Sequence, residues 1–122
     1  MLIKVMNQKV NFIDENDVFV GYDLAEKCCE NANWYFGDKK DTGKRIDRRD
    51  DIPAQQQINV EGYVFDTAYF FKSKDKDPEV QFRLIKKGCK HIYLNLFNVH
   101  NGYYEHGFNA QKGVEKWVAG RL

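Results

Sequence analysis

The stretch Tyr93–Phe108, YLNLFNVHNGYYEHGF, alternates apolar and polar residues, reaches an Asn-Gly dipeptide and continues with aromatic residues and histidines. Asn101-Gly102 is the pair that a two-residue type I′ turn prefers, because both central residues of that turn need a positive φ. The alternation before the dipeptide is typical of a β-strand. The stretch therefore predicts a β-hairpin with its turn at Asn101-Gly102.

Several other segments show strand-like patterns. Val60–Lys72 predicts a long strand with a bend at Gly62 or Asp66, and Val80–Leu84 predicts a strand whose Gln81 and Arg83 face water. Trp34–Phe36 predicts a brief strand or a packed turn, and Val114–Leu122 either a closing strand or a helical turn. Three short strands are expected in the first 22 residues: Leu2–Met6, Val10–Ile13 and Val18–Tyr22.

One short helix is expected to begin at Leu24. Asp23 stands three residues before Glu26, which is the spacing of a capping box. The apolar residues that follow have the spacing of one buried helical stripe: Leu24, Ala25, Cys28, Cys29 and Ala32.

Asp38–Gln57, DKKDTGKRIDRRDDIPAQQQ, is the longest polar segment and is read as a charged loop. Loops of this length in a small domain are usually functional or without fixed structure. Arg45, Arg48 and Arg49 offer contacts to phosphates, but neighbouring aspartates nearly cancel their charge. A solvated loop of mixed charge is the favoured interpretation.

These elements predict a single domain over residues 1–122, because the chain is long enough for one core and too short for two. The short, evenly spaced strands predict an α+β fold that is predominantly antiparallel β. The expected architecture is a curled sheet forming a sandwich or a partial barrel, with one short helix.

The charge balance limits the classes of partner. Lys+Arg 19 against Asp+Glu 18 leaves a net charge of +1, which argues against nucleic acid and anionic membranes. No stretch approaches the roughly 18 apolar residues that span a bilayer, and the N-terminal residues do not resemble a signal peptide. A cytoplasmic location is expected.

The cysteines and histidines do not form a recognisable site. Cys28, Cys29 and Cys89 are expected to be free thiols in a reducing compartment. Adjacent cysteines cannot easily direct both sulfur atoms at one zinc ion, and no second ligand pair is present. A cysteine nucleophile would need an orienting residue and an oxyanion loop, and neither is recognisable. We therefore expect no metal, no cofactor and no catalysis, with zinc and nucleophile as disfavoured alternatives.

The return strand of the predicted hairpin is the candidate binding surface. Tyrosine is enriched at interfaces because it buries a large area at small entropic cost. Side chains alternate along a strand, so Tyr104, His106 and Phe108 share one face while Tyr103 and Glu105 share the other. Only one set can belong to the core, and plain hairpin packing is the favoured alternative to binding. The candidate partner-binding residues are Tyr103, Tyr104, Glu105, His106, Arg45, Arg48 and Arg49.

Two segments, DLAEKCCENANWYFGD and LFNVHNGYYEHGF, together resemble a family of small bacteriophage and prophage proteins. In that family a Cys-Cys-Glu segment precedes a late Asn-Gly-Tyr-Tyr hairpin. The likeness leaves Asp38–Gln57 and the C-terminal segment without a counterpart. The family has no established catalytic residues, so the resemblance implies a setting, a phage accessory protein in the host cytoplasm, and no mechanism.

That setting favours a non-enzymatic protein that binds a host protein and blocks it, such as a CRISPR or other bacterial defence component. The alternative is a small-molecule or nucleotide-binding protein that sequesters a defence signal. It would need a concave pocket lined by aromatic and basic residues such as Arg45, Arg48, Arg49 or Arg83. The expected edge strands are also compatible with a homodimer formed by strand pairing.

Overall fold

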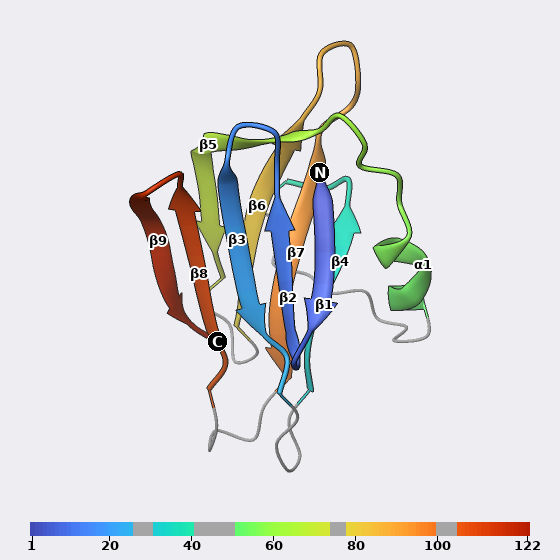
Figure 1. The fold of residues 1–122 in the computed structure, drawn as a ribbon. Coiled ribbons are helices and arrows are strands. Elements are labelled where there is room, and N and C mark those ends of the chain that lie inside the picture. The colour runs from blue at the N-terminus through green and yellow to red at the C-terminus, as the bar shows by residue number, and fades with distance from the viewer. Residues whose placement is uncertain (26–30, 41–50, 74–77, 100–104) are drawn as a thin grey trace.

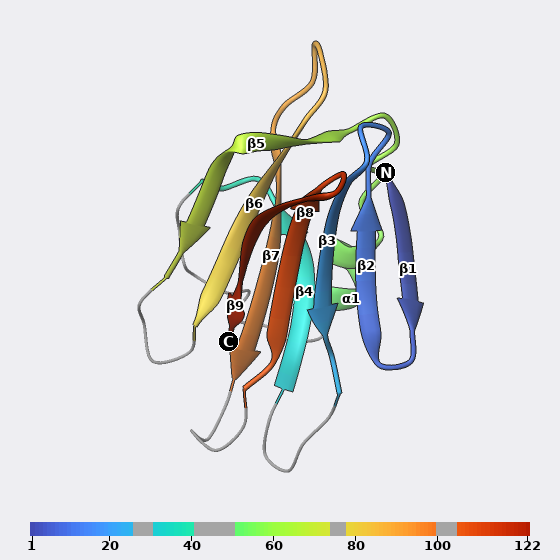
Figure 2. The same cartoon turned by 60° about the vertical axis from the view of Figure 1, so that its left-hand side comes forward.

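The computed structural model describes residues 1–25, 31–40, 51–73, 78–99 and 105–122. Their strands form two antiparallel sheets that pack face to face as a sandwich (Figures 1 and 2). Sheet A has the strand order β1-β2-β3-β8-β9, and sheet B has the order β4-β7-β6-β5. The elements are β1 Leu2–Met6, β2 Lys9–Ile13, β3 Val18–Asp23, β4 Asn31–Gly37, α1 Ile52–Gln56, β5 Val64–Lys72, β6 Glu79–Ile85, β7 Ile92–Val99, β8 Gly107–Lys112 and β9 Glu115–Arg121.

The main core lies between the two sheets and is rich in aromatic residues. Phe12 of sheet A meets Trp34 of sheet B edge to face, with ring centroids 5.1 Å apart. Phe82 lies at 5.4 Å from Trp117 in the same kind of geometry. Such pairs add to the stabilisation from apolar burial. The prediction of a mainly antiparallel β sandwich with one short helix is confirmed.

The three strands expected in the first 22 residues are present and form an antiparallel meander, in which a tight turn fixes the register of β1 and β2. Asn7 and Gln8, the two residues between β1 and β2, have φ of 52° and 61°. Positive φ at both positions is the mark of a type I′ hairpin turn, which suits the twist of the flanking strands. The register then pairs Val5 with Val10 and Lys4 with Asn11.

The predicted hairpin across Asn101-Gly102 is wrong. β7 belongs to sheet B, where it pairs with β4 and β6, whereas β8 belongs to sheet A and pairs with β3 and β9. The connection between them therefore crosses from one sheet to the other. The dipeptide itself lies outside the described residues. A turn preference is local, and it does not determine whether the two strands beside it pair.

The predicted helix at Leu24 is also not found where the structure describes the chain. Asp23 ends β3, and its carboxylate accepts the N–H of Ala25 at 2.9 Å, as in an Asx turn. Ala32 belongs to β4, and Cys28 and Cys29 lie outside the described residues. The helix that does form, α1, falls inside the segment predicted as a loop. Its sequence signal is Pro53 in the first turn, a position that proline favours.

Other expectations about strands are confirmed. Trp34–Phe36 lies in β4, and the C-terminal segment forms the strand β9. β5 is shorter than Val60–Lys72, with Gly62 in a turn at φ 79° before it. Its register with β6 shifts between Phe65 and Phe70, close to the bend expected at Asp66.

Buried polar links join the sheets, among them those made by Asp14 and Tyr22. Asp14, which follows β2, accepts the N–H groups of Asn16 and Val18 through Oδ1 and that of Phe65 in sheet B through Oδ2 at 2.8 Å. The hydroxyl of Tyr22 donates to the carbonyl of Phe97 at 2.8 Å. Among the helices of the described part of the chain, none is long and apolar enough to cross a membrane.

Candidate functional site

The outer face of sheet B, the face turned away from sheet A, carries a buried network of hydrogen bonds. Gln81 donates to the side-chain oxygen of Asn95 at 2.8 Å and to the carbonyl of Lys39 at 3.0 Å, and it accepts from the hydroxyl of Tyr69. Glu79 accepts from the hydroxyl of Tyr35 at 2.7 Å. Gln81, Asn95 and Glu79 are each only 2% exposed. The prediction that Gln81 faces water is therefore wrong.

The polar face is buried because residues 38–40 and α1 lie against sheet B. Ile52 of α1 joins Tyr35 and Phe97 in a second apolar cluster outside the main core. The side-chain amide of Gln56 donates to the carbonyl of Trp34 at 2.9 Å and to Oδ1 of Asn33 at 2.8 Å. We call residues 38–40 and α1 the cover. Part of the segment predicted as a solvated loop thus seals one face of the sandwich and caps the outer edge of β4.

Arg83 lies on the same polar face and contacts other side chains of the protein. Its guanidinium lies 4.2 Å from the ring centre of Tyr69 and pairs with the carboxylate of Asp66 at 3.3 Å. Burial alone would lower the pKa of Arg83, but the hydroxyl of Tyr93 and the carboxylate of Asp66 raise it above its ordinary value. The side chain therefore stays charged and already has its counter-ion. This arrangement does not favour Arg83 as a ligand for a free nucleotide.

The structure describes two of the predicted partner-binding residues. Glu105 is exposed, as a surface contact requires. His106 is 1% exposed and lies inside, with Nδ1 at 3.0 Å from the carbonyl oxygen of Asp23 and its backbone paired with Leu122. His106 lies on the core side together with Phe108, so this face of the segment is the buried one. The prediction of His106 as a surface contact is therefore wrong. The other predicted contacts, Tyr103, Tyr104, Arg45, Arg48 and Arg49, lie outside the described residues.

The strongest exposed apolar surface of the described chain was not predicted. Three of the five large hydrophobic side chains that stand most exposed there lie on β1: Leu2 at 51%, Val5 at 63% and Met6 at 59%. Val5 pairs with Val10, which is completely buried, and shares its inward face. Val5 therefore faces the core side at a margin where little of the molecule covers it. Both faces of β1 present uncovered apolar side chains.

Within the described residues β1 also has an open backbone edge, because it is the first strand of sheet A and pairs with β2 alone. In a two-residue hairpin the pair beside the turn, here Met6 and Lys9, is hydrogen-bonded, and bonded and non-bonded pairs then alternate. Ile3 and Val5 therefore direct their backbone N–H and C=O groups away from β2. Such groups are a template for another strand.

The other three edge strands are protected by features that β1 lacks. β9 carries exposed Glu115, Lys116 and Arg121. β4 is capped by Gln56 of α1, and β5 is interrupted by its register shift. Charges, covering elements and bulges are the usual ways in which proteins prevent strand addition. On β1 the single charged side chain is Lys4.

The titratable groups do not assemble into a metal centre within the described residues, where no three of His, Cys, Asp and Glu come together. Cys89 is a free, exposed thiol, as predicted. Comparisons with family models, with curated proteins and with solved structures found no significant match. The resemblance to phage proteins therefore stays a prediction.

Proposed function

We propose that the protein is a non-enzymatic binding protein and that β1 is the strand on which its partner docks. The observation that supports this proposal is the gathering of exposed Leu2, Val5 and Met6 on the one edge strand that lacks protection. An extended segment of a partner can add to such an edge. Main-chain hydrogen bonds then supply affinity, and alternate side chains supply specificity.

Lys4 favours a strand from a different protein over a second copy of this chain. In the antiparallel register that overlaps all five residues of two β1 strands, Lys4 stands opposite Lys4 of the other copy. Like charges directly opposite each other are destabilising. A partner strand with Asp or Glu opposite Lys4 and apolar residues beside it would match both the charge and the apolar flanks. Its acidic residue would lie in a non-hydrogen-bonded pair, where side chains come closest.

The partner class follows from the resemblance to phage and prophage proteins. We propose that the partner is a host protein of a bacterial defence system and that binding blocks it sterically. A specific complex of this kind buries about 1,200–2,000 Å². Strand addition at β1 would form its centre, with the adjoining surface of sheet A as its periphery.

The test compares backbone and side-chain variants of Val5. Val5→Pro removes an N–H that points away from β2, so it deletes a docking group and no hydrogen bond of the fold. Val5→Ala keeps that N–H, and Val114→Ala is the matched control because Val114 is a fully exposed valine away from β1. Proteins captured from a lysate of bacteria with an active defence system are identified by mass spectrometry. The complex is then rebuilt from purified components and its affinity measured.

We expect a stoichiometric complex with the wild-type protein and with Val114→Ala. Val5→Pro should weaken it about tenfold or more, since one lost hydrogen bond and its steric conflict reach about 1.4 kcal/mol. Val5→Ala should have a smaller effect. Thermal melting checks that each variant is folded. If a folded Val5→Pro variant binds the same partner as tightly as the wild type, docking on β1 is refuted.

A further inference from the structure

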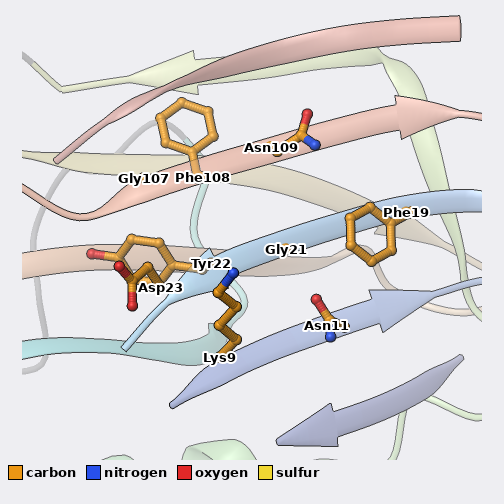
Figure 3. A pocket seen from close by; sticks show the side chains of 9 residues that line it. All are labelled: Lys9, Asn11, Phe19, Gly21, Tyr22, Asp23, Gly107, Phe108 and Asn109. Atoms are coloured by element: carbon orange, nitrogen blue, oxygen red, sulfur yellow. The ribbon is translucent and has the colours of Figure 1, made fainter. Parts of the chain in front are cut away.

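A depression of about 350 Å³ lies on the outer face of sheet A, over the central strand β3 and its neighbours β2 and β8 (Figure 3). Its volume is at the lower end of the range for small-molecule sites. Gly21 and Gly107 lie in its floor. The side chains of its rim alternate with core residues and therefore point outward: Lys9, Asn11, Phe19, Asp23 and Asn109.

Gly21 makes room for the Phe19 ring in the depression. Its φ is not positive, so its backbone conformation does not require glycine. A Cβ at this position would lie 2.9 Å from Cζ of Phe19 and 3.0 Å from Oδ1 of Asn11. The Phe19 ring thus lies over the glycine, and Figure 3 shows the ring nearly face-on from the outside. A side chain larger than glycine is therefore disfavoured here, because the Phe19 ring and the Asn11 amide fill the space in which it would lie.

Two amide side chains stand on opposite sides of Gly21. Asn11 of β2 and Asn109 of β8 are its register partners, so their Cα atoms are two strand spacings apart, about 9.6 Å. Neither amide hydrogen-bonds to another residue of the described chain. Each offers one carbonyl acceptor and two N–H donors. The Phe19 ring lies between them over Gly21, so the two amides stand on either side of an aromatic surface on which a six-membered ring can pack.

The charges around the depression cancel. Lys9 and Asp23 are register partners on β2 and β3, and they contribute one positive and one negative charge. Asp23 would repel a phosphate, and one lysine is a weak anchor for it. A neutral ligand is therefore favoured over a nucleotide.

We infer that this depression binds a monosaccharide ring, either free or as the end of a glycan. Sugar hydroxyls both donate and accept hydrogen bonds, which matches amide groups that do the same, a carboxylate acceptor and an ammonium donor. The apolar C–H face of a pyranose can pack on the exposed face of Phe19. The inference goes beyond the proposed protein-binding function, because it concerns a different surface and a different class of ligand.

The test is an NMR titration of the full-length protein with the methyl glycosides of glucose, galactose, mannose and N-acetylglucosamine. Adenosine and inorganic phosphate are titrated in parallel. For a ligand of about a dozen heavy atoms in an open site, we expect a Kd on the order of 1 mM for at least one sugar. The side-chain NH₂ signals of Asn11 and Asn109 and the amide of Gly21 should shift in a saturable way.

Variants locate the binding. Asn109→Ala should raise the Kd about fivefold or more, because it removes one amide of the pair. Gln111→Ala is the matched control, two residues along the same strand and outside the depression, and it should leave the Kd unchanged. Gly21→Ala should abolish binding because the added methyl group displaces the Phe19 ring on which the sugar packs, with thermal melting as a check on folding.

Three outcomes would overturn the inference. One is the absence of saturable shifts with every sugar up to about 50 mM, far above the expected Kd. Another is saturable binding of adenosine or phosphate alone. The third is sugar binding that Asn109→Ala leaves as tight as in the wild type while that variant is folded.

Discussion

The outer faces of the two sheets carry similar residues, but one face is buried and the other is partly exposed. On sheet B, Gln81 and Asn95 hydrogen-bond to each other and are almost fully buried beneath the cover. On sheet A, Asn11 and Asn109 flank Gly21 and remain partly exposed, and no element of the described part of the chain covers them. The edges follow the same division, since β4 is capped by α1 whereas β1 is open. The molecule thus has one closed side that stabilises it and one open side that is available for binding.

The largest expected effect is on the closed side. Gln81→Ala removes a buried side chain that bonds to Tyr69, Asn95 and the backbone of Lys39, so it leaves a cavity and broken hydrogen bonds. We expect the free energy of unfolding to fall by about 2–4 kcal/mol, measured by urea denaturation. The matched change on the open side, Asn109→Ala, should alter it by less than about 0.5 kcal/mol. Equal losses at both sites would contradict the division between the two faces.

A smaller effect is expected where the cover meets β4. Gln56→Ala removes the hydrogen bonds to Asn33 and to the carbonyl of Trp34, at a cost of about 1–2 kcal/mol. Hydrogen exchange should speed up in β4 before it does in the core strands, because the edge is uncapped locally. Gln57→Ala is the control, since that neighbouring glutamine is exposed. Uniform protection of β4 in both variants would show that α1 does not hold this edge.

The strands and the main core could be predicted from the sequence because their signals are local. Asn11 separates Val10 from Phe12, and Gly21 separates Val20 from Tyr22, so these four residues show the alternation of a half-buried strand, and all four are buried. The burial of Gln81 could not be predicted in this way. Its strand alternates like one with a wet face, and it is residues 38–40, far away in the sequence, that cover it. Polar residues on a strand therefore do not reveal whether another segment lies above them.

Strand pairing and the candidate site could not be predicted from local sequence patterns either, because both depend on how distant segments are arranged. An Asn-Gly turn predicts where a chain reverses, but β7 pairs with β4 and β6 in sheet B, whereas β8 pairs with β3 and β9 in sheet A. β1 was predicted as a strand, yet its exposure depends on its place at the margin of sheet A. The run of apolar residues around Lys4 was a usable signal. Its meaning became clear only once β1 was known to be an edge.

The smallest expected change in stability comes from Lys4, although its effect on association should be clear. Lys4→Val removes the single charge of β1 and adds a residue that favours strands, so the free energy of unfolding should stay within about 0.5 kcal/mol. Without the repulsion between two Lys4 side chains, β1 strands of two copies should pair. Sedimentation should then show a dimer or larger species where the wild type shows less association. Lys116→Val on β9 is the control, because Glu115 and Arg121 still protect that edge. If both variants associate to the same extent, Lys4 has no special role at the open edge.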